Sequence, residues 1–76
     1  MEKIYINTPY IKLDQLLKFA NITSCGADAK LLICEGYVKL NGETETRRGK
    51  KIYDGDEIYI EFEGEKFSLK VIKSEN

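Results

Sequence analysis

Hydrophobic and polar residues alternate over residues 2–6, "EKIYI", and a spacing of two predicts a short β-strand. The turn-forming "NTP" of residues 7–9 predicts the end of that strand. Over residues 11–21 the hydrophobic spacing changes to i, i+3, i+4 and i+7, the pattern of an amphipathic helix, at Leu13, Leu16, Leu17 and Ala20. The same helix would turn its polar residues to water, namely Lys12, Asp14, Gln15 and Lys18.

A second helix is predicted from residue 25 to residue 35, "CGADAKLLICE", because Thr23 and Ser24 are residue types that cap a helix start. Its hydrophobic face would consist of Ala29, Leu32 and Ile33. Gly36 follows as the glycine that commonly ends a helix.

After Gly36 the spacing returns to two. The sequence "YVKL", the pair Asn41-Gly42 and "ETET" predict a β-hairpin, since Asn-Gly supplies the positive φ of a tight turn. A second hairpin is predicted from "DGDEIYIEF", the turn at Glu63-Gly64 and "EKFSLKVI". Taken in order, these elements predict an α+β fold with two helices packed on one face of a small, mostly antiparallel sheet. We expect residues 1–76 to form a single domain.

Composition narrows the class of protein. The chain has 76 residues, 42% hydrophobic and 33% charged, which is typical of a folded domain with a thin core and little room for a deep active-site cleft. It contains no apolar run near the roughly 18 residues of a membrane span. Its first residues, "MEKIYINTPY", lack the layout of a signal peptide. We therefore expect a soluble, cytoplasmic protein.

The cysteines give little sign of chemistry. Two cysteines and no histidine argue against both a disulfide scaffold and a zinc site. On one helix, Cys25 and Cys34 would lie on opposite faces. Cys34 is interpreted as a small buried hydrophobic residue, and Cys25 as an inert residue or, at a helix start, a reactive thiol. We expect no metal, cofactor or catalytic residue.

Charge is distributed unevenly along the chain. The net charge is -1, yet residues 12–51 hold eight basic and five acidic residues, whereas residues 52–65 hold six acidic residues and no basic one. Four of the bases lie within the five residues "RRGKK" at positions 47–51. Such a cluster beside two basic helix faces favours binding to a polyanion, and the alternative is a solvated charge run.

The order of motifs resembles the RNA-binding domain named after ribosomal protein S-four, also called the alpha-L motif. The family pattern is a basic residue with Leu-Asp and spaced leucines, then Ala-x-x-Leu-Ile-x-x-Gly, Val-x-Val-Asn-Gly and Gly-Asp-x-Ile. The matching positions are Lys12, Leu13 and Asp14 with Leu16 and Leu17; Ala29 with Leu32, Ile33 and Gly36; residues 38–42, "VKLNG"; and Gly55, Asp56 and Ile58. The chain is most similar to small stand-alone, YaaA-type members.

The resemblance implies a non-catalytic protein that recognises structured ribosomal or transfer RNA, possible roles being ribosome assembly or translation. Many relatives begin the second helix with Ser-Arg, where this chain has Cys25 and Gly26. The backbone there could hold a phosphate instead, or Ser24 could simply cap the helix. Asn41 could contact RNA or serve only as a turn residue. The implied RNA-binding residues are Lys12, Lys18, Ser24, Gly26, Lys30, Lys39, Asn41, Arg47, Arg48, Lys50 and Lys51.

Other interpretations of the sequence remain. The tyrosines are scattered, with only Tyr53 close to the basic cluster, which favours recognition of RNA shape over base stacking. A small β-grasp-like carrier or protein-interaction module is the alternative, although such carriers end in Gly-Gly and this chain ends in "KSEN". Asp54 and Asp56 could be paired catalytic carboxylates but are better explained as a turn. A protein partner could cover the acidic face, and a monomer is favoured.

Overall fold

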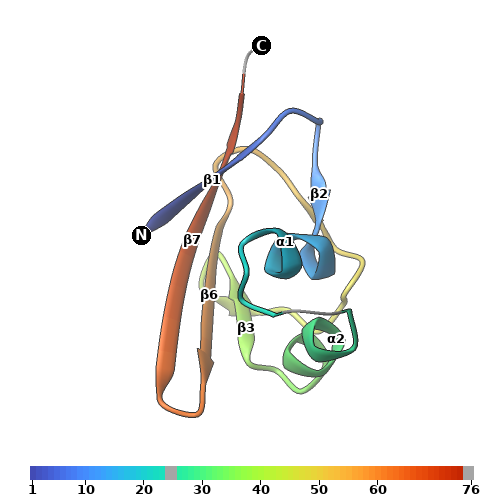
Figure 1. Cartoon of the computed structure of the whole chain (residues 1–76), viewed down its shortest axis with the longest axis vertical. Helices are drawn as coiled ribbons and strands as arrows, with labels where there is room; N and C mark the ends of the chain where they lie inside the picture. The colour runs from blue at the N-terminus through green and yellow to red at the C-terminus, as the bar shows by residue number, and fades with distance from the viewer. Residues whose placement is uncertain (24–25, 75–76) are drawn as a thin grey trace.

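The computed structural model describes residues 1–23 and 26–74 (Figure 1). Within these residues, one sheet has the strand order β1-β7-β6-β3-β4, and a separate two-stranded ribbon is formed by β2 and β5. The strands of the sheet are β1 (Glu2–Ile6), β3 (Val38–Leu40), β4 (Glu43–Thr44), β6 (Glu57–Phe62) and β7 (Glu65–Lys73).

Both predicted hairpins are present in the sheet. Strands β6 and β7 pair antiparallel from Glu57 opposite Lys70 to Phe62 opposite Glu65. Strand β3 pairs antiparallel with β4 and with the other edge of β6. At the turn between β3 and β4, Asn41 has φ 51° and Gly42 has φ 90°, the positive values that a two-residue hairpin turn requires. Strand β1 instead pairs parallel with β7, which the sequence pattern did not predict.

Helices α1 (Leu13–Phe19) and α2 (Gly26–Cys34) lie on the same side of the sheet (Figure 1). The apolar face of each helix packs against the strand residues that point toward the helices, and this packing removes both apolar surfaces from water. This confirms the predicted fold of two helices on one face of a mostly antiparallel sheet. The buried core consists of Leu13, Leu16 and Leu17 from α1, Ala29, Leu32 and Ile33 from α2, and Ile4, Ile6, Val38, Ile52, Ile58, Ile60, Leu69 and Val71 from the strands.

The prediction for Cys34 was wrong, because this cysteine is exposed. The inward face of α2 is centred on Ala29 and Ile33, and Cys34 lies about 100° further round the helix than Ile33. It therefore shares the outward side of α2 with Leu31, which is also exposed. Cys25 and the predicted cap at Ser24 lie outside the described residues.

The ribbon is made of two very short strands, β2 (Ile11–Lys12) and β5 (Lys51–Ile52). They pair antiparallel, with Ile11 opposite Ile52 and Lys12 opposite Lys51. Ile52 is fully buried, so one face of the ribbon joins the core and the other carries the two lysines outward. No helix among the described residues is long and apolar enough to cross a membrane.

Candidate nucleic-acid interface

Residues 47–51, here called the basic segment, are attached to the start of α1. The first N–H groups of a helix have no partner within the helix. In α1 the Leu13 N–H donates to the Lys50 carbonyl at 2.9 Å, and the Asp14 N–H donates to the Arg48 carbonyl at 3.1 Å. The basic segment therefore completes the helix start with its own backbone, and its position relative to α1 is fixed by two hydrogen bonds.

Lys12 joins the basic segment through the ribbon. It directly precedes α1, and its cross-strand partner is Lys51. Like charges placed opposite each other across two strands are destabilising. The pairing of Lys12 with Lys51 therefore concentrates positive charge on the exposed face of the ribbon.

Arg47 is the member of the basic segment with an acidic partner on its side chain. Its Nε atom donates to Glu45 Oε2 at 2.9 Å and its guanidinium also donates to Glu45 Oε1 at 3.1 Å. The side chain of Glu45 is only 12% exposed, whereas that of Arg47 is 72% exposed. Hydrogen bonding from Arg47 lowers the pKa of Glu45 to about 2. Glu45 therefore stays ionised and offsets part of the positive charge of Arg47.

Asn41 makes structural contacts through its side chain as well as its turn backbone. Its amide Nδ2 donates to Asp56 Oδ1 at 3.1 Å, and its Oδ1 accepts a hydrogen bond from the Glu57 N–H at 2.9 Å. These bonds tie the β3–β4 turn to the start of β6. Asn41 also lines a shallow hollow together with Arg47 and Lys50, so its location is compatible with the predicted RNA contact, which stays a prediction.

The two aspartates that could have been catalytic are parts of a turn. Asp54 Oδ1 accepts a hydrogen bond from the Lys73 N–H at 2.7 Å. Asp56 Oδ2 accepts one from the Tyr53 N–H at 2.8 Å, while its Oδ1 accepts from Asn41. Each carboxylate is thus occupied by groups that hold β5, β6 and β7 together.

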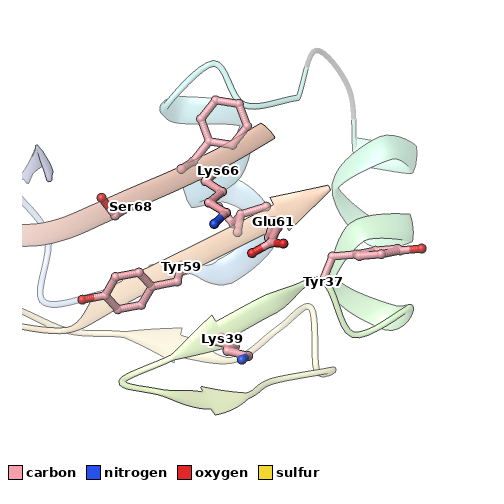
Figure 2. A pocket seen from close by; sticks show the side chains of 8 residues that line it. Tyr37, Lys39, Tyr59, Glu61, Lys66 and Ser68 are labelled. Carbon is pink, nitrogen blue, oxygen red and sulfur yellow. The ribbon is translucent and has the colours of Figure 1, made fainter. Parts of the chain in front are cut away.

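Lys39 points away from the helix side of the sheet. Its neighbour Val38 is fully buried against the helices, and successive side chains of a strand point to opposite faces. On the open face, Lys39 lines a hollow with Tyr37, Tyr59 and Lys66 (Figure 2). The sheet therefore separates Lys39 from the helix side, and its predicted part in RNA binding would require contact with a second face.

Of the remaining predicted RNA-binding residues, the structure places all but Ser24. Lys18, in the last turn of α1, and Lys30, on α2, are both exposed. Gly26 is the first residue of α2, and Ser24 lies outside the described residues. The contribution of these four residues to RNA binding stays a prediction.

Tyr10 is a feature of this surface that the sequence interpretation missed. The rings of Tyr10 and Tyr53 have centroids 5.9 Å apart, and Lys51 Nζ lies 4.9 Å from the Tyr10 centroid. Forty-three positions separate the two tyrosines in the sequence. The available signal is the mirrored pattern Tyr-x-Lys at residues 10–12 and Lys-x-Tyr at residues 51–53, which matches two strands paired antiparallel.

The acidic residues at the β6–β7 turn lie at a different end of the molecule. Figure 1 shows that turn at the lower end of the sheet, whereas the basic segment runs beside α1 and β2 on the opposite side of the helices. Glu61, Glu63 and Glu65 belong to the turn region and are exposed. The fold thus separates Glu61, Glu63 and Glu65 from the basic segment, whereas Asp56 stays near that segment through its hydrogen bonds with the Tyr53 N–H and the Asn41 amide.

The fold is that of the S4 domain family. The family model described as "S4 domain" matches residues 4–70, and the chain belongs to that family.

Relatives and a solved structure agree with this assignment. The chain is 43% identical over 58 residues to "Probable ribosome maturation protein RlbA" of Bacillus subtilis, covering 76% of this chain and 82% of that protein. It is 42% identical over 50 residues to "Putative RNA-binding protein YbcJ" of Escherichia coli, covering 66% of this chain and 71% of that protein. The solution structure of YbcJ, described as having an alpha-L motif involved in RNA-binding, aligns with a TM-score of 0.66 at 36% identity, covering 95% of this chain and 87% of that one.

Proposed function

We propose that this chain is a non-catalytic protein that binds structured ribosomal or transfer RNA and acts in ribosome assembly or translation. The observation that carries the proposal is the attachment of the basic segment to the start of α1, where Lys12 adds to the same charged surface. This arrangement fixes the backbone of several positively charged residues beside the start of α1.

A fixed set of cations favours recognition of a particular spacing of phosphates. Double-stranded RNA is read mainly by its shape and by contacts to phosphates and 2′-hydroxyls, because its deep groove excludes side chains. A rigid cluster fits that mode better than a flexible basic tail, which would bind any polyanion. Each phosphate contact also releases a counterion, so we expect affinity to fall steeply with salt.

The names of the relatives support the choice of RNA and of the process. RlbA is named for ribosome maturation and YbcJ for RNA binding, and a role in ribosome maturation would place this chain in the cytoplasm. A non-catalytic role is supported by Asp54 and Asp56, whose carboxylates accept hydrogen bonds from backbone N–H groups. A carboxylate engaged in this way is poorly suited to transfer a proton to a substrate.

The proposal is tested by comparing two RNAs of the same composition at one salt concentration. The first is a hairpin fragment of ribosomal RNA, and the second is an unstructured oligonucleotide with the same bases. We expect tighter binding to the hairpin, measured by fluorescence anisotropy with the labelled RNA. Equal affinities, or tighter binding to the unstructured strand, would contradict recognition of structured RNA.

A further inference from the structure

The outward face of the ribbon carries a compact group of two tyrosines and two lysines. Side chains alternate along a strand, so Tyr10 shares a face with Lys12, and Lys51 shares a face with Tyr53. The register places Lys12 opposite Lys51, and the next outward positions along each strand are Tyr10 and Tyr53. The ring centroid separation of 5.9 Å, with the rings tilted by 52°, shows that the tyrosines do meet.

Lysines share the outward face of the ribbon with the tyrosines, while Asp56, whose Oδ2 accepts a hydrogen bond from the Tyr53 N–H at 2.8 Å, lies on the other side of Tyr53 in the sequence. Lys51 Nζ lies 4.9 Å from the centroid of the Tyr10 ring, a distance typical of a cation–π contact. Tyr53 is 49% exposed although it is a large aromatic residue, and Tyr10 is half-buried. The pair therefore presents aromatic surface to solvent next to Lys12 and Lys51.

Each tyrosine of the pair lines a hollow of its own, and the hollow of Tyr53 contains three basic residues whereas that of Tyr10 contains one. One is lined by Tyr53 together with Arg47, Lys50 and Lys51. The other is lined by Tyr10 together with Pro9, Lys12 and Phe19. A nucleic-acid backbone that crosses the ribbon would meet positive charge before and after the aromatic pair.

We propose that Tyr10 and Tyr53 form a stacking site for one unpaired base of the bound RNA, while Lys12 and Lys51 contact the phosphates that flank it. This inference rests on the proposed function and names the feature of the RNA that the site selects. Bases inside a duplex are covered by their neighbours, so an aromatic platform acts on a bulged or looped nucleotide. The combination of aromatic rings with a basic surface is the chemistry that binds single-stranded nucleotides.

A matched tyrosine elsewhere on the molecule provides the control. Tyr59 lies on the open face of the sheet and is also exposed. Its hydroxyl donates to Glu57 Oε1 at 3.1 Å, and the hollow beside it is lined by one acidic residue, Glu61, and by Lys39 and Lys66. Tyr59→Ala thus removes a comparable ring from the open face of the sheet, away from the ribbon and the basic segment.

The experiment uses the ribosomal RNA hairpin in two forms, one with a bulged adenosine in its stem and one with the stem fully paired. The bulged adenosine is replaced by 2-aminopurine, whose fluorescence is quenched by stacking. We expect Tyr53→Ala to weaken binding of the bulged form by about 5-fold to 100-fold. Quenching should be lost, the salt dependence should be unchanged, and binding of the paired form should change little.

Two control variants sharpen the result. Tyr53→Phe keeps the ring and should retain both affinity and quenching, and Tyr59→Ala should bind both forms as the wild type does. If Tyr53→Ala weakens both forms equally, or weakens neither, the stacking site is wrong. If the wild type binds neither form, the proposed function itself fails.

Discussion

Asn41 shows how one residue can serve a turn and a strand junction together. Its backbone takes the positive φ of the hairpin turn, and its side-chain amide joins Asp56 and Glu57 across the sheet. The sequence identified the turn from Asn41-Gly42 but could not identify these bonds, because their partners lie 15 and 16 positions away. Cys34 illustrates the same limit. Its hydrophobic character predicted burial, but its angular position around the axis of α2 places it on the exposed side.

Two substitutions at Asn41 separate its roles in stability. Asn41→Gly keeps the positive φ but removes the amide, so we expect a loss of about 1–3 kcal/mol in the free energy of unfolding. Asn41→Ala should lose about 1 kcal/mol more, because a side chain other than Asn or Asp is strained at that φ. Urea denaturation measures both values. Wild-type stability in both variants would show that the two hydrogen bonds do not stabilise the fold.

Glu45 restrains the guanidinium of Arg47 and is therefore expected to weaken RNA binding. Glu45→Gln should tighten binding and increase the dependence of affinity on salt, because it removes a negative charge and releases Arg47 for a phosphate. Glu43→Gln is the matched control, since it removes an exposed charge two residues earlier, in β4, without touching this ion pair. Binding titrations at several salt concentrations compare the two. An equal effect of both variants would show that only net charge matters.

The same pair gives a pH dependence of stability. The pKa of Glu45 is about 2 in the folded protein and 4.5 ordinarily, so the ion pair stabilises the fold fully above pH 4.5 and loses its effect as the pH falls towards 2. We expect the stability difference between the wild type and Glu45→Gln to be greatest near neutral pH and to shrink over that range. Thermal unfolding at a series of pH values measures it. A difference that stays constant down to pH 2 would argue against the pair.

At the scale of elements, the sequence did not predict the parallel pairing of β1 with β7 or the ribbon, whose residues 11 and 12 were expected in the first helix. Strands of two residues are too short to show an alternation of hydrophobic and polar positions, unlike residues 2–6 or 57–62. The helices and hairpins were predicted because their apolar positions recur over several turns or pairs. The two short strands, however, are what fix the basic segment against α1, so the charged residues were predicted while their arrangement was not.

Glycines in and near the basic segment provide a test of its backbone. Gly49 does not have a positive φ, and a Cβ atom there would meet nothing within 4 Å. Gly49→Ala should therefore retain wild-type RNA affinity and raise stability by up to about 1 kcal/mol. Gly55 is equally open but has φ 89°, so Gly55→Ala should be destabilised by about 1–2 kcal/mol. If both variants behave alike in denaturation, the backbone conformation of the segment has been assigned wrongly.

At the scale of the whole molecule, the fold determines where the charged residues of the sequence lie relative to one another. The chain is nearly neutral, yet the basic segment and Lys12 lie beside α1 while the acidic β6–β7 turn lies at another end (Figure 1). Lys39 shows why a count of basic residues does not predict where the positive charge lies, because strand alternation places this lysine on the open face of the sheet. The family could be identified from ordered motifs, whereas the orientation of each basic side chain depended on pairing across the fold.

The central claim is that the position of the basic segment, and not net charge, produces RNA binding. It is tested most directly by the slope of log K against log salt for two variants that each lose four positive charges. One changes Arg47, Arg48, Lys50 and Lys51 to Ala, and its matched control changes Lys3, Lys66, Lys70 and Lys73 of β1 and β7 to Ala. Thermal unfolding first establishes that both variants are folded.

We expect the first variant to bind the ribosomal hairpin weakly, with a slope smaller in magnitude by about 3, because Arg47 is already held by Glu45 and each lost phosphate contact reduces the slope by nearly 1. The control variant should keep a slope close to that of the wild type. Equal changes in affinity and slope in both folded variants would contradict the claim that the segment beside α1 is the RNA-binding surface.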